Sequence, residues 1–244
     1  MRPTIVLVHG AFAESASWDG VIDLLADAGH RVIAVANPLR GVAADAAVVS
    51  DLVRTIDGPV VLVGHSYGGA VITNADADAG SIAGLVYVAG FAPESGESAR
   101  TLSGRFPGST LGAAIQAVSL SDGTTDLFIS QEHFHAQFAA DVRRPQAARM
   151  AVTQRPIKPQ ALDEPTGARP LWKELPSWFL FGEDDRGIPA ALHRFMAERA
   201  GARRTIEIPG ASHAIAVSEP DATAQLILDA ARRLWRDAAL GVAA

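Results

Sequence analysis

A single serine stands among glycines directly after a run of apolar residues. Residues 60–63 (VVLV) lead into GHSYGG at 64–69, and a helical pattern follows over residues 70–77. The spacing G-x-S-x-G between a strand and a helix is typical of a tight turn that presents the serine hydroxyl to open space. Larger side chains two residues away would collide in such a turn. A glycine-rich turn with an incidental serine is the alternative, but the strand-helix context favours Ser66 as a nucleophile.

A serine hydroxyl attacks a carbonyl carbon only when a nearby base accepts its proton, and histidine is the usual base. Among the seven histidines, His213 lies in PGASHAIAVSEP, between the last strand-like run and the last helical pattern, at the same expected sheet end as Ser66. His65 lies inside the serine turn and should point away from the nucleophile. His30 and His193 have helical surroundings, which are typical of surface or packing positions. We therefore predict His213 as the base, the alternative being a solvent-exposed loop histidine.

Two further histidines, His133 and His135, have an H-x-H spacing that suits a metal ion when both residues lie on a strand. Their segment reads as a helix, which points the two rings apart, so we predict no metal site. The chain contains no cysteine, which excludes disulfides, thiolate nucleophiles and cysteine metal ligands.

The base needs a carboxylate that orients its ring. Three acids, Glu183, Asp184 and Asp185, follow the apolar run at residues 178–181. Their charges alone do not choose among them. The order serine, acid, histidine along the chain is the order of an α/β-hydrolase triad.

Short apolar runs that could position these residues alternate with helical patterns over most of the chain. All of the runs except the last are free of charged residues, as expected for strands buried on both faces. They cover residues 5–8, 32–36, 60–63, 85–89, 178–181 and 205–208. Such alternation predicts an α/β fold in which a mostly parallel sheet has helices on both sides and right-handed crossovers.

One long interval interrupts this alternation. Residues 93–175 contain no convincing buried strand but include helix-like pieces near 130–142 and 145–154. A structureless loop of that length is uncommon in a compact domain, so we expect a helical cap insertion. Residues 1–92 and 176–244 would then form the core. The insertion leaves after the strand at 85–89, whose carboxyl end should face the site, so we expect it to cover Ser66.

Composition limits the partners and the location. The net charge of −6 gives no basic face for nucleic acid or an anionic membrane. The segment AFA at 11–13 resembles a signal-peptidase site, but the apolar run before it is shorter than the roughly 7–15 residues that a signal peptide needs. No run approaches the ~18 apolar residues of a membrane span. We therefore expect a cytoplasmic protein with no membrane or nucleic-acid partner.

Several segments together resemble the α/β-hydrolase superfamily. They are VLVHGAFAESASW, NPLRG, GHSYGG, GEDDRGIP and GASHAIAVSEP, and the likeness spans nearly the whole chain except the insertion. The branch it resembles most comprises small bacterial hydrolases related to plant methylesterases and hydroxynitrile lyases. That resemblance implies an α/β-hydrolase fold of about six mostly parallel strands. Asn37-Pro38 departs from the Asp-x-Pro-Gly that many relatives carry there.

The resemblance also assigns residues. The family pattern Gly-x-x-Asp-x-x-(Ile/Val)-Pro aligns with Gly182 and Asp185, which favours Asp185 over Asp184. The backbone N–H of Tyr67, at a helix N-terminus, should point to where an oxyanion forms. The family pairs that donor with an N–H corresponding to Ala11, and Phe12 would border the pocket.

The implied activity is hydrolysis of a small, uncharged, largely apolar ester, with no cofactor. Phe134 and Phe138, one helical turn apart in the insertion, could form the roof of the substrate pocket, or the insertion's own core. Lyase, perhydrolase and cofactor-free oxygenase chemistry use the same triad, and a non-catalytic ligand receptor can keep it. Lyase relatives place a lysine where this chain has Arg186, which disfavours cyanohydrin cleavage. Both a monomer and a homodimer remain open.

Overall fold

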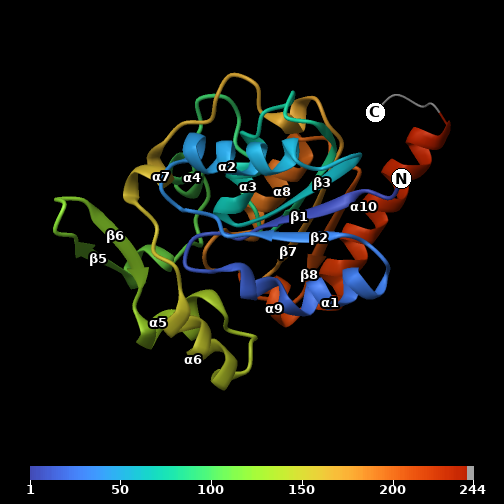
Figure 1. The fold of residues 1–244 in the computed structure, drawn as a ribbon. Helices are drawn as coiled ribbons and strands as arrows, with labels where there is room; N and C mark the ends of the chain where they lie inside the picture. The colour runs from blue at the N-terminus through green and yellow to red at the C-terminus, as the bar shows by residue number, and fades with distance from the viewer. Residues whose placement is uncertain (241–244) are drawn as a thin grey trace.

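Six parallel strands form the central sheet of the computed structural model, which describes residues 1–240. The strand order is β2-β1-β3-β4-β7-β8, and every neighbouring pair is parallel (Figure 1). The strands are β1 (Thr4–Val8), β2 (Val32–Val35), β3 (Pro59–His65), β4 (Ser81–Val88), β7 (Ser177–Gly182) and β8 (Arg204–Ile208). The predicted α/β-hydrolase fold, with about six mostly parallel strands, is confirmed.

Helices cover both faces of this sheet, as Figure 1 shows. Along β1, the side chains of Val6 and Val8 join one apolar core, whereas those of Ile5 and Leu7 join the other. Strands β1, β3 and β7 thus bury both of their faces, which explains their uninterrupted apolar runs, whereas the edge strands β2 and β8 are only partly buried. The first face carries α2 (Val42–Arg54), α3 (Tyr67–Thr73) and α8 (Ala190–Arg199), and the second carries α1 (Asp19–Asp27), α9 (Ile215–Ser218) and α10 (Pro220–Leu240). Within residues 1–240, no helix has both the length and the hydropathy that crossing a bilayer requires.

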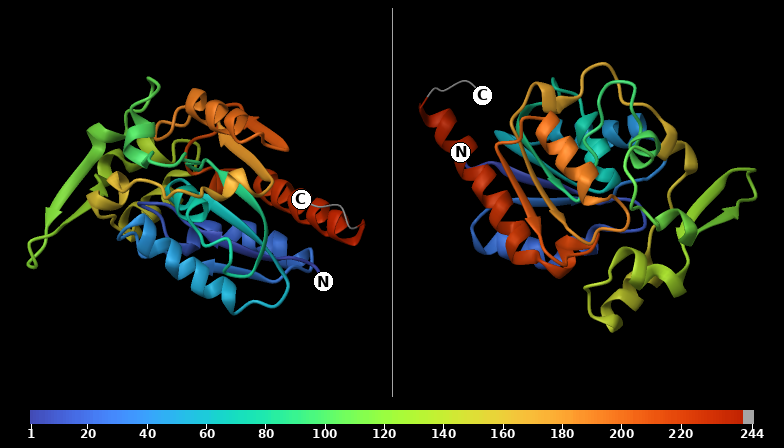
Figure 2. Two further views of the ribbon diagram at one scale, coloured as in Figure 1. Left: turned by 90° about the horizontal axis from the view of Figure 1, so that it is seen from above. Right: turned by 180° about the vertical axis from the view of Figure 1, so that it is seen from behind.

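The long interval between β4 and β7 holds the remaining elements. Its middle part, residues 111–163, lies at the end of the molecule away from both termini in Figures 1 and 2. Its elements are α4 (Ala99–Ser103), β5 (Ile115–Ser119), β6 (Thr125–Ile129), α5 (Gln131–Phe138), α6 (Arg144–Thr153) and α7 (Pro159–Asp163), with short 3-10 turns at η2 (Leu111–Ala114) and η3 (Leu171–Lys173). The 3-10 turn η1 (Ser15–Trp18) precedes α1.

The sequence predicted a helical insertion, but the interval is not purely helical. Its strands β5 and β6 form an antiparallel hairpin. The hairpin projects away from the central sheet in both views of Figure 2. Four of the five residues of β5 are exposed, so this strand lacks the apolar signature of a buried one.

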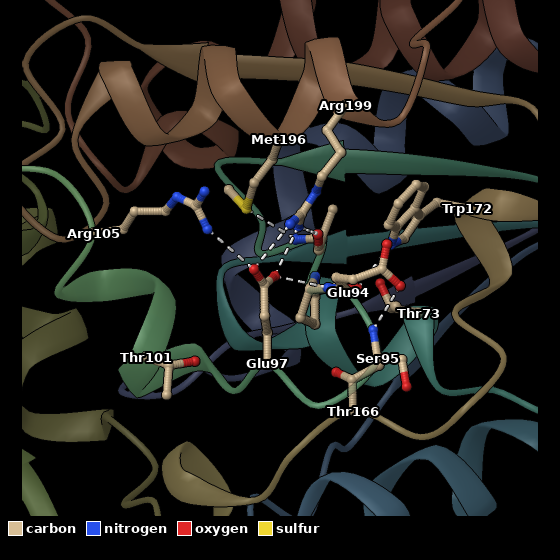
Figure 3. Close-up of polar contacts among 12 residues, drawn as sticks. Thr73, Glu94, Ser95, Glu97, Thr101, Arg105, Thr166, Trp172, Met196 and Arg199 are labelled. Atoms are coloured by element: carbon tan, nitrogen blue, oxygen red, sulfur yellow. Dashed lines mark hydrogen bonds and ion pairs between the residues drawn. The ribbon is translucent and has the colours of Figure 1, made fainter.

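A polar network fastens the start of the insertion to α8 (Figure 3). The Glu97 carboxylate accepts hydrogen bonds from Arg199 of α8 and from Arg105. Arg199 also donates to the carbonyl oxygen of Ala92 at 2.8 Å, and its guanidinium lies 5.4 Å from the ring centre of Trp172. The indole N–H of Trp172 donates to the Pro93 carbonyl at 2.8 Å. Arg199 of the core thus contacts residues near both ends of the insertion, Glu97 and Trp172.

Candidate active site

Ser66 lies at the sharp turn between β3 and α3. Its backbone has φ 53° and ψ −123°, a conformation that a non-glycine residue rarely adopts and that costs about 1–3 kcal/mol. A Cβ on Gly64 would lie 2.5 Å from the Gly68 carbonyl oxygen, and one on Gly68 would lie 2.3 Å from the Val8 carbonyl oxygen. Only glycine fits at these two positions, because the backbone approaches too closely for any side chain.

Ser66, His213 and Asp185 form a continuous hydrogen-bonded chain. The His213 Nε2 lies 2.8 Å from the Ser66 Oγ, and the His213 Nδ1 lies 2.7 Å from the Asp185 Oδ2. The three side chains come from the loops after β3, β8 and β7, which all leave the carboxyl end of the sheet. Since the carboxylate accepts the Nδ1–H, the Nε2 is left to accept the serine proton.

The structure separates Asp185 from its acidic neighbours. Asp185 is buried, whereas Glu183 and Asp184 are exposed. The Asp185 Oδ1 accepts backbone N–H groups from Gly187 at 2.8 Å and Ile188 at 2.9 Å. Burial alone would raise the pKa of this carboxyl, but the nearby imidazoles and their hydrogen bonds outweigh burial and hold the pKa below its usual range. Asp185 therefore stays ionised inside the protein.

His193 also contacts Asp185, which the sequence pattern did not indicate. Its side chain is fully buried, and its Nε2 lies 3.2 Å from the Asp185 Oδ2. The prediction of a surface or packing position missed this polar contact. The available signal was that α8 begins at Ala190, directly after the acid loop, so its first turns must face that loop. Burial lowers the pKa of His193.

Two backbone N–H groups border Ser66, as the oxyanion prediction requires. Tyr67 is the first residue of α3, and Ala11 follows Gly10, where an added Cβ would lie 2.5 Å from the Ser66 Cβ. Within residues 1–240, neither the Ala11 nor the Tyr67 N–H donates a hydrogen bond to another part of the chain. The Phe12 N–H instead donates to the Arg155 carbonyl at 3.1 Å. Both N–H groups are therefore without an acceptor in the part of the chain that the structure describes.

Buried polar contacts fix both of these backbone segments. The Tyr67 hydroxyl donates to the buried Asp45 carboxylate at 2.8 Å, and burial raises the pKa of both groups. The Asn37 amide donates to the His9 carbonyl at 2.9 Å, and the Asn37 backbone N–H donates to the His9 Nε2 at 3.1 Å. Asn37 thus holds the segment that leads to Ala11. The sequence did not predict either role for Asp45 or Asn37.

A cavity of about 420 Å³ opens in front of Ser66, between the core and the insertion. The surrounding side chains are mainly apolar, and both core and insertion contribute them. Among the lining residues are Phe12, Phe91, Leu111, Ile115, Leu127, Phe138, Leu162 and Ile188. Arg100 also borders the cavity, where it forms an ion pair with Asp163.

The two candidate roof residues lie differently. Phe138 lines the cavity, and its ring centre lies 5.0 Å from that of His213. Phe134 does not line the cavity: it is fully buried behind Phe138, with 5.0 Å between the two ring centres. Phe134 lies one helical turn before Phe138 in α5, and it packs in the apolar core. The expectation that Phe134 contacts substrate is therefore corrected.

Comparison with known proteins agrees with this architecture. Residues 5–226 match the model of the "Alpha/beta hydrolase family". The pyrethroid hydrolase of Sphingobium wenxiniae is 31% identical over 245 residues, which cover 92% of this chain and 86% of that protein. The carbendazim hydrolyzing esterase of Nocardioides sp. is 36% identical over 110 residues, which cover 40% of this chain and 46% of that protein.

Among solved structures, polyneuridine aldehyde esterase has a similar fold, with a TM-score of 0.77 at 19% identity. The match covers 94% of this chain and 99% of that one. The predicted resemblance to the superfamily is confirmed, and the chain belongs to the alpha/beta hydrolase family.

Proposed function

We propose that this chain is a serine hydrolase that cleaves a carboxylic ester through an acyl-enzyme on Ser66. The observation that carries this proposal is the hydrogen-bonded chain from the Ser66 Oγ through His213 to Asp185, with separations of 2.8 and 2.7 Å. The names of the pyrethroid hydrolase and of the carbendazim hydrolyzing esterase support ester cleavage. Ser66, Asp185 and His213 are the proposed catalytic residues.

In the proposed reaction, the Ser66 Oγ attacks the ester carbonyl carbon while the His213 Nε2 accepts the hydroxyl proton. The resulting oxyanion accepts hydrogen bonds from the Ala11 and Tyr67 N–H groups, each worth roughly 3–4 kcal/mol of the barrier. When the C–O bond to the alcohol breaks, His213 returns the proton to the leaving oxygen. Water then attacks the acyl-enzyme, with His213 accepting its proton and returning it to Ser66. None of these steps needs a cofactor.

The cavity supports an uncharged, largely apolar ester as substrate. Its lining is mainly aliphatic and aromatic, and its Arg100 is already paired with Asp163. A volume of about 420 Å³ lies within the range of roughly 300–1,000 Å³ that holds drug-sized ligands. Phe12 and Phe138 line the cavity together with Ser66 and are the proposed substrate contacts.

Residues 93–175 are proposed to act as a cap that selects among esters. Residues of α4, η2, β5, β6 and α7 border the cavity, together with Phe138 of α5. The triad and both oxyanion donors lie outside this segment. Changes in the cap should therefore alter which ester is accepted, because they reshape the cavity. They should leave the chemical steps intact, because the reacting groups stay in place.

Turnover of p-nitrophenyl acetate by wild type, Ser66→Ala and Ser103→Ala tests the proposed activity. Ser103 lines the same cavity but donates to the Ala99 carbonyl at 2.8 Å, so Ser103→Ala is the matched control. We expect Ser66→Ala alone to lose turnover, and a fluorophosphonate probe to label Ser66. Labelling without hydrolysis of any ester in a panel would point to lyase, perhydrolase or oxygenase chemistry. If the protein shows no labelling and no turnover, it is a non-catalytic receptor.

A further inference from the structure

Two histidines share one oxygen of the Asp185 carboxylate. The Asp185 Oδ2 lies 2.7 Å from the Nδ1 of His213 and 3.2 Å from the Nε2 of His193. The other oxygen, Oδ1, accepts the N–H groups of Gly187 and Ile188. Asp185 thus accepts four hydrogen bonds, which matches the roughly four acceptor sites of a carboxylate. The mechanism proposed above uses only the bond to His213.

The surroundings of His193 fix which nitrogen carries its proton. Its ring stacks on Phe181, with 4.8 Å between the ring centres and an interplanar angle of 14°. Its Nδ1 is buried and has no hydrogen-bond partner within residues 1–240. A proton on Nδ1 would have no acceptor there, and burial lowers the pKa of the ring. His193 is therefore neutral, with its proton on Nε2, where it donates to Asp185.

Few other charges act on this pair of histidines. The charge of Glu207 in β8 acts to raise the pKa of His193, against the effect of burial. Glu207 is partly exposed, however, and forms an ion pair with Arg194. His65 lies 4.9 Å from His213 between ring centres, and burial lowers the pKa of His65 to about 3, so this ring stays neutral. Asp185 is thus the carboxylate that both His193 and His213 contact directly.

We propose that His193 is a positioning residue, whose Nε2–H holds the Asp185 carboxylate in place and limits how strongly this carboxylate binds protonated His213. The inference rests on the proposed hydrolase function, in which His213 gains and releases a proton in each half-reaction. A carboxylate that already accepts a hydrogen bond from a second donor attracts the His213 imidazolium less strongly. His213 then releases its proton more readily to the leaving alcohol.

Two substitutions separate the donor from the ring. His193→Phe keeps a flat ring against Phe181 but removes the hydrogen bond to Asp185. His193→Gln keeps an N–H donor at about the place of Nε2. The measurement is kcat/KM for p-nitrophenyl acetate across pH, where the acid limb reports protonation of His213.

In His193→Phe, we expect the acid limb to move to higher pH by roughly half a unit, because Asp185 then stabilises protonated His213 more strongly. In His193→Gln, the limb should stay at its wild-type position. A purely structural role would lower the plateau of kcat/KM and leave the limb in place, and that result would overturn the proposal. An equal shift in both variants would also overturn it, since the donor would then be irrelevant.

Nitrogen-15 NMR of the wild-type histidine rings gives a second measurement that depends on neither variant folding. His193 should show the neutral tautomer with the proton on Nε2 throughout the pH range of activity. The Nδ1–H tautomer, or a charged ring at neutral pH, would contradict the inference. This measurement does not depend on turnover, so the positioning role and the proposed function can fail separately.

Discussion

Replacing Asp185 with asparagine should abolish most of the activity, for a reason that the backbone dictates. The N–H groups of Gly187 and Ile188 donate to Oδ1, so the amide oxygen of the asparagine must take the Oδ1 position. The amide NH₂ then takes the Oδ2 position and faces the Nδ1 of His213. That nitrogen must accept a hydrogen bond, which moves the His213 proton to Nε2.

A His213 ring with its proton on Nε2 cannot accept the proton of Ser66. The expected loss is about 10⁴-fold in kcat, the size seen when the carboxylate of a serine-histidine-aspartate triad becomes an amide. Asp184→Asn is the matched control, because Asp184 is the exposed neighbour in the same loop. Because Asp184 lies outside the triad, the kcat of Asp184→Asn should stay close to wild type. A surface substitution of this kind also usually changes stability by less than about 0.5 kcal/mol.

The assay is kcat for a p-nitrophenyl ester, with the melting temperature of each variant measured alongside. Similar melting temperatures would show that the loss in Asp185→Asn is not unfolding. Comparable activity in the two variants, or a larger loss in Asp184→Asn, would refute the assignment of the acid. It would also refute the argument that Oδ1 fixes the direction of the amide.

Gly68→Ala should lower the melting temperature strongly, because its Cβ would lie 2.3 Å from the Val8 carbonyl oxygen, and thermal unfolding measures this effect. Phe138→Ala should change the order of preference in a series of p-nitrophenyl esters, whereas Phe134→Ala should lower the melting temperature and keep that order. Burial lowers the folded pKa of His65 to about 3, so the unfolded chain binds the extra proton and stability should fall as pH drops below about 6.5. In His65→Phe, this fall should weaken by about 1.4 kcal/mol per pH unit, measured by chemical denaturation between about pH 4 and 6.

The sheet could be predicted from the sequence because burial on both faces leaves a simple signal. Residues 60–63 are apolar without interruption, and in β3 their side chains alternate between the two cores. The same pattern located the other strands to within a few residues. The main difference is β4, which begins at Ser81, where the side chains are partly exposed and the apolar run had not yet started.

The hairpin in the insertion left no such signal. Four of the five residues of β5 are exposed, so neither an apolar run nor an alternation marks the strand. Its pairing with β6 depends on backbone hydrogen bonds, which every residue except proline can form. A strand with so few buried side chains is therefore difficult to recognise from one sequence.

Polar contacts around the triad were also beyond the sequence, since they depend on how separate elements meet. Asp45 lies on α2 and reaches Tyr67, which lies on α3. Asn37 follows β2 and reaches His9, which follows β1. No local pattern links the two members of either pair. Ser66 was easier to recognise, because the glycines that its turn requires lie within two residues of it.

The charges of the buried site explain why His213 alone is arranged to gain a proton. Burial lowers the pKa of His9 to about 4 and that of His65 to about 3, and it lowers the pKa of His193 as well. Those three rings therefore remain neutral and serve as hydrogen-bonding groups. His213 differs because its two nitrogens face the Asp185 carboxylate and the Ser66 hydroxyl. When Ser66 attacks, the new positive charge on His213 forms next to a carboxylate that is already ionised and fully hydrogen-bonded, so little reorganisation is needed at the moment of reaction.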